Sequence, residues 1–246
     1  MGLLAEFNQR IGNDIVDLKA GVFESERAFT RFRDRVCTAR ERRWLVANFS
    51  GDPSGRLRGI WSLWAAKEAV YKARSMPETP GAVFEFPMDF VPRNIEIVSD
   101  PSIKSARVRL RSRSAAEFIR TDLIVRFRHS ASWVHALCYR RAARQPFVWI
   151  GRQDPARAGQ ALARDESRAV RDLCLERISL AAGIPREELS IHGGRASGRA
   201  PWLKYRGGPA RRARRSAISL SHDGEWLAGA SPRSFRKTST GTGTSE

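Results

Sequence analysis

Cysteine is scarce in this 246-residue chain, and its distribution argues against two kinds of site. The three cysteines, Cys37, Cys138 and Cys174, are odd in number and far apart in the sequence. Structural zinc sites and disulfide frameworks both need cysteines at characteristic spacings. The sequence therefore predicts neither, and we expect the three thiols to be reduced and buried.

Long hydrophobic runs are also absent. A membrane-spanning helix needs about 20 consecutive apolar residues, and no stretch of the chain reaches that length. Near the amino terminus, charged residues such as Glu6, Arg10 and Asp14 interrupt the apolar ones, unlike in a signal peptide. We therefore expect a cytoplasmic protein without membrane contact. Hydrophobic residues make up 41% of the chain, and with seven tryptophans and twelve phenylalanines they suffice for a core.

Acidic residues are few relative to basic ones. The chain has 26 Asp and Glu against 44 Lys and Arg, which gives a formal net charge of +18. Such an excess favours an anionic partner, whether nucleic acid, an acidic protein or a polyphosphate ligand. Because most of the positive charge is arginine, a compositional bias of the genome explains it equally well. Composition leaves these alternatives open.

The most informative stretch is Trp61 to Ala73, WSLWAAKEAVYKA, whose apolar residues recur at helical spacing. In a helix, Glu68 and Lys72 lie together at the edge of the apolar face. The same spacing is that of an ordinary surface ion pair, which stabilises a helix by only a few tenths of a kcal/mol. The two side chains are therefore either a stabilising pair or part of a functional site.

A second carboxylate stands in the strand-like run Ile11 to Leu18, IGNDIVDL. In an alternating strand, Asp14 shares a face with Gly12 and Val16, whereas Asp17 faces the other way. A carboxylate among apolar neighbours needs a cation or a network of hydrogen bonds. Asp14 is therefore a further candidate functional residue, and the alternative is a structural cap or turn residue.

The remainder of the first 142 residues predicts one α+β lobe. Glu24 to Phe49 favours one or two amphipathic helices, and the glycines and proline between Ser50 and Gly59 favour a loop. Further on, period-two alternation predicts four antiparallel strands, at Ile95 to Val98, Ala106 to Arg111, Leu123 to Phe127 and Trp133 to Tyr139. We expect residues 1–142 to pack a helix on a small antiparallel sheet.

The second half predicts a similar mixture of elements. Residues 141–165 are expected to connect the lobes, and Glu166 to Ala182 predicts an amphipathic helix that ends at Gly183. Four segments follow: a short strand at Ser190 to His192, a glycine-rich loop at Gly193 to Pro201, a basic stretch at Lys204 to Arg215 and a hairpin at Ala217 to Ala230 with its turn at His222 to Gly224. We expect a second lobe at residues 143–230 and a disordered tail at residues 231–246.

Together, the strand IGNDIVDL and the helix WAAKEAVYKA resemble the paired signature of the 4'-phosphopantetheinyl transferases. That family carries roughly G-x-D-(I/V)-(V/E) and, some tens of residues later, (W/F)-x-x-K-E-(A/S)-x-x-K. Both patterns are present here in the same order. The resemblance implies a holo-acyl-carrier-protein synthase type of enzyme. Such an enzyme moves the 4'-phosphopantetheine group of coenzyme A to a serine of an acyl or peptidyl carrier protein, releasing adenosine 3',5'-bisphosphate.

The carboxy-terminal part carries a second resemblance. Its helix from Ser167, the run GRAPWL at 198–203 and the sequence SLSHDG are similar to the amino-terminal half of the long, monomeric members of the family. In those members this half precedes the metal-binding half, whereas here it follows. The segments FRHSASWVHAL at 127–137 and LSHDGEWLA at 220–228 resemble each other, which favours an internal duplication of the chain. We therefore expect two pseudo-symmetric lobes in permuted order, forming a pseudo-dimeric monomer with coenzyme A in the cleft between them.

The resemblance also implies roles for the candidate residues. It assigns Asp14 and Glu68 to a magnesium site, and Glu68 and Lys72 to the catalytic machinery. Lys72 is expected to contact the diphosphate of coenzyme A and to favour proton loss from the attacking serine through its charge. Long members place a further carboxylate where this chain has Val16, so we expect two protein carboxylates on the metal.

The residues that the resemblance assigns to coenzyme A binding are Lys72, Arg199, Ser221 and His222. The Ser-His pair is expected at the nucleotide end, although an exposed histidine with no function is the alternative for His222. Ala200 is an insertion relative to the family pattern and shifts the match at Arg199. His129 is a competing copy of His222 and ranks below it. The basic stretch at 204–215 is expected to grip phosphate or the acidic helix of a carrier protein, or else to be a solvated loop.

Motifs of other nucleotide-binding folds are missing. The glycine-rich stretch follows no Rossmann strand, and the chain has no Walker lysine. The rival function is a non-catalytic basic module that keeps the fold and binds RNA or DNA. Because no nucleic-acid-binding motif supports it, we do not expect nucleic acid to be the partner.

Overall fold

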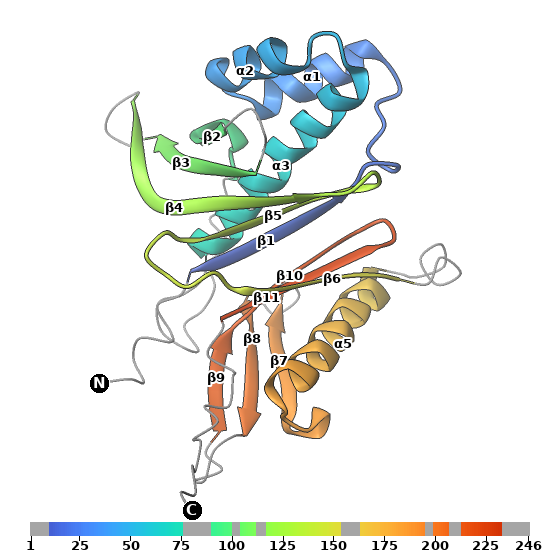
Figure 1. Cartoon of the computed structure of the whole chain (residues 1–246), viewed down its shortest axis with the longest axis vertical. Helices are drawn as coiled ribbons and strands as arrows, with labels where there is room; N and C mark the ends of the chain where they lie inside the picture. Colours follow the sequence, from blue (N-terminus) through green and yellow to red (C-terminus); the bar gives the residue numbers. More distant parts are fainter. Residues whose placement is uncertain are drawn as a thin grey trace, which may run out of the picture.

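The computed structural model describes residues 10–75, 90–99, 104–111, 117–153, 163–194, 199–206 and 213–232. These residues form four α-helices and three antiparallel sheets, so the predicted α+β class is confirmed. Figure 1 shows two stacked parts: the first half of the chain with helices α1 to α3, and the second half with helix α5.

The first half is organised around a five-stranded antiparallel sheet in the order β1-β5-β4-β3-β2. Its strands are β1 (Ile11–Asp17), β2 (Ile95–Ser99), β3 (Ser105–Arg111), β4 (Phe118–His129) and β5 (Trp133–Arg140). The strands predicted from alternation are all present. β1 lies at one edge of the sheet, with Asp14 opposite Ala136 of β5.

Three helices lie between β1 and β2 along the chain: α1 (Glu26–Val36), α2 (Ala39–Phe49) and α3 (Pro53–Ser75). The amphipathic helices expected between Glu24 and Phe49, predicted as one or two, are thus confirmed and are two in number. Each begins at a side-chain cap, with Ser25 capping α1, and Thr38 forming a capping box with Glu41 at the start of α2. α3 packs against β1 and β5 and carries the predicted helix.

The predicted loop at Ser50 to Gly59 is wrong from Pro53 onward, where α3 begins, and only residues 50–52 lie outside a helix. Proline is well tolerated in the first turn of a helix, where its missing N–H has no partner to lose. Gly59 lies inside the helix because α2 packs so close that a Cβ there would come within 2.8 Å of the Leu45 side chain. This glycine therefore serves close helix packing, a role that its sequence context cannot distinguish from a turn.

β1 and α3 approach very closely at Gly12. A Cβ on this residue would overlap the carbonyl oxygen of Ala69 and lie 2.6 Å from the backbone nitrogen of Ala73. Only a residue without a side chain lets the strand backbone rest directly on the helix. This contact sets the distance between Asp14, two residues further on, and α3.

A buried ion pair fastens α3 to its neighbours. Lys67 Nζ lies 2.7 Å from Glu41 Oε2, and the two side chains are only 0% and 1% exposed. Their other hydrogen bonds go to backbone groups of nearby elements: the carbonyls of Val36, Pro92 and Ile95, and the N–H groups of Thr38 and Ile97. The pair thereby joins α1, α2, α3, the 3-10 turn η1 (Pro92–Asn94) and β2.

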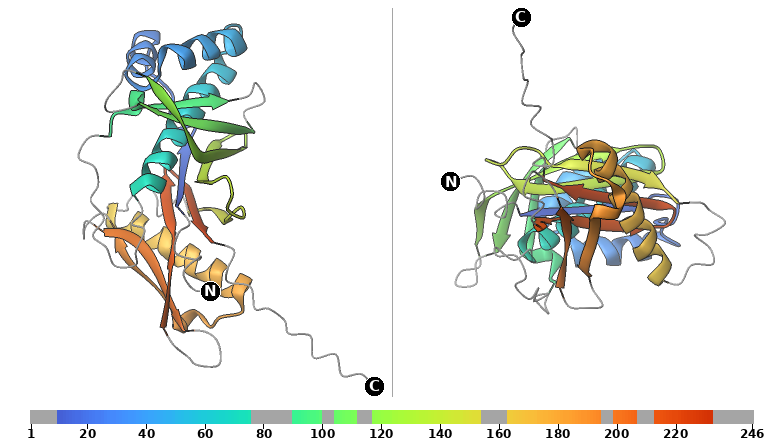
Figure 2. Two further views of the ribbon diagram at one scale, coloured as in Figure 1. Left: turned by 90° about the vertical axis from the view of Figure 1, so that its left-hand side faces the viewer. Right: turned by 90° about the horizontal axis from the view of Figure 1, so that it is seen from below.

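The second half contains α5 (Ala163–Ala182) and two three-stranded sheets. One sheet has the order β10-β11-β6 and consists of β6 (Phe147–Arg152), β10 (Ser219–Asp223) and β11 (Trp226–Ser231). The other consists of β7 (Leu189–Gly194), β8 (Arg199–Arg206) and β9 (Ala213–Ala217), in that order. α5 packs against β7, β10 and β11 (Figure 2). It ends as predicted before Gly183, whose φ of 62° is the left-handed conformation that glycine favours.

Two predictions for connecting segments need correction. Residues 141–165 contain β6, which pairs with β11, because the apolar run FVWI is long enough to form a strand. The basic stretch is strand where it is described, with Lys204 of β8 opposite Arg215 of β9, while residues 207–212 lie outside the described part. A solvated loop is therefore wrong for the paired residues.

The segments around the carboxy-terminal hairpin also differ in their limits. Gly194 and Arg199 belong to paired strands, so the glycine-rich loop is shorter than expected, and its residues 195–198 are not described. His222 lies in β10 opposite Leu227, and the turn consists of Gly224 and Glu225. β11 continues to Ser231, and residues 233–246 of the expected tail lie outside the described residues.

The order of elements repeats along the chain. In the first half, β1 is followed by helices α1 to α3, by η1 and by a run of strands whose last member, β5, pairs with β1. In the second half, β6 is followed by α5, the 3-10 turn η2 (Arg186–Glu188) and a run of strands whose last member, β11, pairs with β6.

The cysteines are free and buried, as predicted. Burial raises the pKa of the Cys37 thiol to about 12 and that of Cys174 to about 12 as well. Thiols that stay protonated in this way are poor nucleophiles. Among the described residues, no helix has an apolar stretch long enough to cross a membrane.

We predict that Gly12→Ala destabilises the protein by about 1–3 kcal/mol or more, because the new methyl group would force β1 away from α3. Urea unfolding of the purified variant measures this. Gly51→Ala is the matched control, since a Cβ there has nothing within 4 Å. Equal stability of the two variants would show that β1 and α3 are not in this close contact.

We also predict that Lys67→Met lowers the free energy of unfolding by about 3–5 kcal/mol, since it leaves the Glu41 carboxylate buried without its cation. The control is Arg186→Met, which breaks a 3.0 Å pair with Asp172 whose side chains are 45% and 58% exposed. Exposed pairs contribute about 0–1 kcal/mol. Similar losses in both variants would contradict the buried arrangement.

Candidate active site

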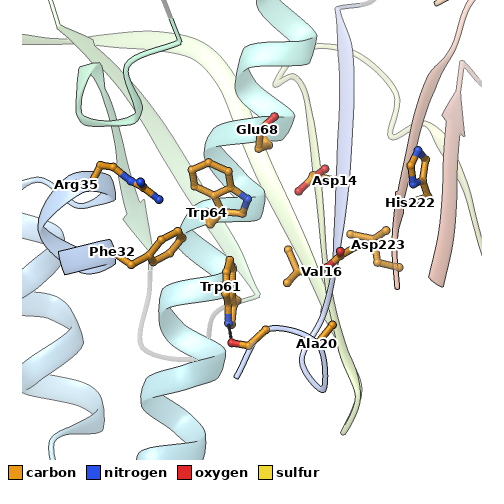
Figure 3. Close-up of a pocket in the computed structure, with 12 residues that line it drawn as sticks. Asp14, Val16, Ala20, Phe32, Arg35, Trp61, Trp64, Glu68, His222 and Asp223 are labelled. Carbon is orange, nitrogen blue, oxygen red and sulfur yellow. Dashed lines mark hydrogen bonds between the residues drawn. The ribbon is translucent and has the colours of Figure 1, made fainter. Parts of the chain in front are cut away.

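A pocket of about 400 Å³ opens between the first half of the chain and strand β10. Figure 3 shows its lining residues, which come from β1, α1, α3 and β10. Carboxylates stand on three of these elements: Asp14 on β1, Glu68 on α3 and Asp223 on β10. The pocket therefore brings together residues that are far apart in the sequence.

Asp14 is held by a lysine from α3. Lys72 Nζ donates to Asp14 Oδ1 at 2.6 Å and to the carbonyl oxygen of Asn13 at 3.2 Å. The Lys72 side chain is 27% exposed and that of Asp14 10% exposed. Hydrogen bonds between charged partners in a partly buried setting are among the stronger ones in proteins. The pair thus fixes the middle of β1 to the last turns of α3.

The outer edge of β1 is satisfied by side chains of β10. The backbone N–H groups of Asn13, Ile15 and Asp17 donate to Ser219 Oγ at 2.9 Å, Ser221 Oγ at 3.2 Å and Asp223 Oδ2 at 2.8 Å. Because both strands alternate with period two, successive rungs of this ladder follow every second residue. The ladder joins the two halves of the chain along the side of the pocket.

Ser221 belongs to this ladder and also to the Asp14 network. Its hydroxyl donates to Asp14 Oδ1 at 2.7 Å and lies 3.4 Å from Lys72 Nζ. The residue is only 5% exposed and does not line the pocket. Asp14 Oδ1 is thus engaged by Lys72 and Ser221, which leaves Oδ2 for the pocket.

Asp14 and Glu68 are the oxygen ligands that a hard cation could use. Mg²⁺ in proteins is commonly bound by one or two carboxylates together with water and substrate phosphates. Two residues after Asp14, β1 carries Val16 and not a further carboxylate, as noted from the sequence. Val16 lines the pocket. Within the described ranges, no three His, Cys, Asp or Glu side chains are grouped closely enough to hold a metal ion. The donor set present therefore fits a cation bound by two carboxylates and a ligand.

Asp223 is a carboxylate at the pocket that the sequence did not single out. Burial raises the pKa of its carboxyl group, as do the nearby charges of Asp14 and Asp17. The bond that it accepts from the Asp17 N–H opposes this shift. Its neighbour Gly224, with a φ of 53°, lies against the Asp17 side chain. Only the alternation of SLSHD, with polar residues at every second position, hints at this arrangement.

The opposite wall of the pocket is aromatic. Phe32 and Arg35 of α1 face Trp61 and Trp64 of α3 (Figure 3). Trp61 is fixed by a 2.7 Å hydrogen bond from its Nε1 to the carbonyl oxygen of Gly21 and by stacking on Phe23. The Arg35 guanidinium lies 5.5 Å from the centre of the Phe32 ring. Neither Phe32 nor Arg35 was predicted from the sequence to be a site residue.

The predicted site residues fall into three groups. Asp14, Glu68 and His222 line the pocket, and Lys72 and Ser221 lie beside it, bonded to Asp14. Arg199 is the first residue of β8, opposite Gly194, and only its backbone is described. The structure thus brings together at one pocket all of the predicted site residues except Arg199.

The competing residue His129 does not line the pocket. Its Nε2 lies 3.1 Å from Ser62 Oγ, and the Ser62 hydroxyl is 2.7 Å from the carbonyl oxygen of Arg58. Burial, with a contribution from nearby Arg58, lowers the pKa of His129 to about 4. His222 is therefore the histidine of the pair that the structure places at the site.

Residues 10–138 match a family model described as the 4'-phosphopantetheinyl transferase superfamily. The match spans just over half of the 246 residues and includes Asp14, Glu68 and Lys72. Strand β10 lies outside it. No curated protein matches the chain.

A buried histidine near the site gives a testable pH dependence. His135 of β5 is 0% exposed, and burial, together with nearby Arg128 and Lys72, lowers its pKa to about 3 from 6.5. Between these two values the unfolded chain binds a proton that the folded chain does not. The free energy of unfolding should therefore fall as the pH drops from about 6 to about 4, by up to about 1.4 kcal/mol per pH unit from this residue.

The measurement is urea unfolding of the wild type and of His135→Gln at several pH values. We expect the stability curve of the variant to be flatter over this range, since its side chain does not titrate. Parallel curves would mean that His135 takes up its proton in the folded state as readily as in the unfolded chain.

Proposed function

The chain belongs to the 4'-phosphopantetheinyl transferase superfamily, and we propose that it moves the 4'-phosphopantetheine group of coenzyme A to a serine of an acyl or peptidyl carrier protein. The observation that carries this proposal is the set of Asp14, Glu68 and Lys72 at one pocket. These are the charged residues of the two signature motifs other than Lys67, which is buried. Asp14 is 54 residues from Glu68 and 58 residues from Lys72 in the sequence, and it meets them only in the fold.

The proposed reaction breaks a phosphoanhydride bond of coenzyme A and forms a phosphodiester with the carrier serine. The serine oxygen of the carrier protein attacks the phosphorus atom nearest the pantetheine, and the bond from that phosphorus to the bridging oxygen of the diphosphate breaks. Adenosine 3',5'-bisphosphate leaves with that oxygen, and the proton of the serine passes to solvent. Catalysis of such a transfer depends mainly on positioning and on stabilising negative charge.

We assign the stabilisation of this negative charge to Asp14, Glu68 and Lys72. Mg²⁺ held by Asp14 and Glu68 would neutralise the charge that develops on the diphosphate. Lys72 is held by Asp14 and remains partly exposed, so its ammonium is placed to stabilise the same charge. An ammonium paired with a carboxylate is a weak base, and we therefore assign Lys72 an electrostatic role.

The nucleotide end of coenzyme A is proposed to lie toward the second half. His222 is exposed and lines the pocket on β10, between Ser221 and Asp223, whose side chains belong to the ladder. Arg199 and the basic strands β8 and β9 supply positive charge in the same half. The net charge of +18 suits both coenzyme A and an acidic carrier protein.

We further propose that the two halves are pseudo-symmetric lobes, residues 1–142 and 143–230, in permuted order. The repeated order of strand, helix, 3-10 turn and strands supports this, as does the pairing of the first strand with the last in each half. Permutation is tolerable when a site lies between two lobes, because only the surfaces that meet must be kept. Such a chain would need no partner subunit to complete its site.

The test is the mass of a purified apo-acyl carrier protein after incubation with this protein, coenzyme A and Mg²⁺. We expect the carrier to gain one phosphopantetheine group, and Glu68→Ala to lower kcat/KM by at least about 100-fold, because the metal contributes several kcal/mol to stabilising the transition state. Glu176→Ala, which removes an exposed glutamate of α5, is the matched control and should leave the rate unchanged. No transfer to any of a panel of carrier proteins, with no binding of coenzyme A, would overturn the proposal.

A further inference from the structure

The hydroxyl of Ser221 has all of its hydrogen-bonding capacity in use. A serine hydroxyl has one donor and two acceptor positions. Ser221 accepts from the backbone N–H of Ile15 at 3.2 Å and lies 3.4 Å from Lys72 Nζ, which can only donate. Its single proton is therefore directed at Asp14 Oδ1, 2.7 Å away.

Because all hydrogen-bonding positions of its hydroxyl are in use, Ser221 is poorly suited to contact coenzyme A directly. Ser221 is 5% exposed and is absent from the pocket wall, although its neighbours His222 and Asp223 both line it. In an alternating strand, Ser221 shares a face with Ser219 and Asp223, which also accept from N–H groups of β1. The Ser221 side chain accordingly faces β1, and a phosphate group could reach its hydroxyl only by displacing Asp14 or the Ile15 amide.

The hydrogen bond from Ser221 to Asp14 also restricts the orientation of the Asp14 carboxylate. Oδ1 receives two donors from different directions, the ammonium of Lys72 on α3 and the hydroxyl of Ser221 on β10. Two fixed donors on one oxygen stop the carboxylate from rotating about its Cβ–Cγ bond. The other oxygen, Oδ2, is thereby held in one orientation in a residue that lines the pocket.

We propose that Ser221 is a positioning residue, whose hydroxyl holds the Asp14 carboxylate in the orientation that presents Oδ2 to a divalent cation. This proposal rests on the proposed function of the site. It gives the second half of the chain a direct part in building the metal site, although the carboxylates belong to the first half. It also assigns the Ser-His pair two separate tasks, with Ser221 acting on Asp14 and His222 facing the ligand.

The chain supplies a matched control one rung away. Ser219 is 3% exposed and its Oγ accepts from the Asn13 N–H at 2.9 Å, as Ser221 does from Ile15. No hydrogen bond joins Ser219 to Asp14 among the contacts of the described residues. Ser219→Ala and Ser221→Ala therefore remove the same kind of rung from the ladder, and only the second removes the bond to Asp14.

The experiment measures the affinity of Mn²⁺, as a spectroscopic substitute for Mg²⁺, for the purified full-length chain by electron paramagnetic resonance. We expect Ser221→Ala to bind Mn²⁺ about 10–100-fold more weakly than the wild type, the range typical of losing a partner that orients a metal ligand. Ser219→Ala should retain the wild-type affinity while losing a similar amount of thermal stability. Ser221→Thr keeps the hydroxyl and should retain most of the affinity.

Kinetics with coenzyme A separate the two roles open to Ser221. Positioning predicts that Ser221→Ala lowers kcat with little change in KM for coenzyme A at saturating metal. A raised KM for coenzyme A with unchanged Mn²⁺ affinity would overturn the proposal and return Ser221 to the nucleotide site. Equal Mn²⁺ affinities for the two alanine variants would also overturn it.

The results that would refute the proposed transferase differ from those that would refute the positioning role of Ser221. A wild-type chain that binds Mn²⁺ but neither binds coenzyme A nor modifies a carrier protein would refute the transferase, while the comparison of Mn²⁺ affinities would still decide what Ser221 does to Asp14. A wild-type chain that binds no Mn²⁺, yet transfers phosphopantetheine, would refute the positioning role alone.

Discussion

The open edge of β1 is the constraint on which the rest of the structure depends. An edge strand presents unpaired N–H groups, and burying them without partners costs about 1–3 kcal/mol each. Here Ser219, Ser221 and Asp223 of β10 accept from three such groups on β1, so side chains take the place of a further strand. The ladder joins the two halves of the chain, and its middle rung reaches Asp14 and Lys72. The junction that completes the fold is therefore also the place where the site is built.

Two further features fix the opposite side of the pocket. Gly12 lets β1 rest on α3, and the buried pair of Lys67 and Glu41 ties the core side of α3 to α1, α2 and β2. Consecutive helical residues point about 100° apart, so anchoring Lys67 in the core turns Glu68 toward the pocket. Glu68 and Lys72 then share one face of the helix, four residues apart. The proposed site for a metal and a diphosphate gains from such rigid supports on both walls.

Much of this arrangement could be predicted from the sequence where a local pattern carries the information. Alternation predicted β2 to β5, helical spacing predicted α1, α2 and α5, and the two signature motifs indicated Asp14, Glu68 and Lys72. The start of α3 was missed because Gly55 and Gly59 read as turn residues, and their packing against α2 is a property of the fold. β6 was missed because FVWI is short and lies among turn-forming residues. The tasks of Lys67, Ser221 and Asp223 depend on partners 26 to 207 residues away, which a local pattern does not contain.

The central claim is that both halves of the chain contribute to one site across the junction of β1 and β10. A crystal structure of the wild-type chain with coenzyme A and Mn²⁺, with the metal located by its anomalous scattering, tests it most directly. The account predicts Mn²⁺ bound by Asp14 and Glu68, the diphosphate near Lys72, and the adenosine end against His222 of β10. Mn²⁺ bound away from Asp14 and Glu68, or coenzyme A in contact with residues of one half only, would contradict it.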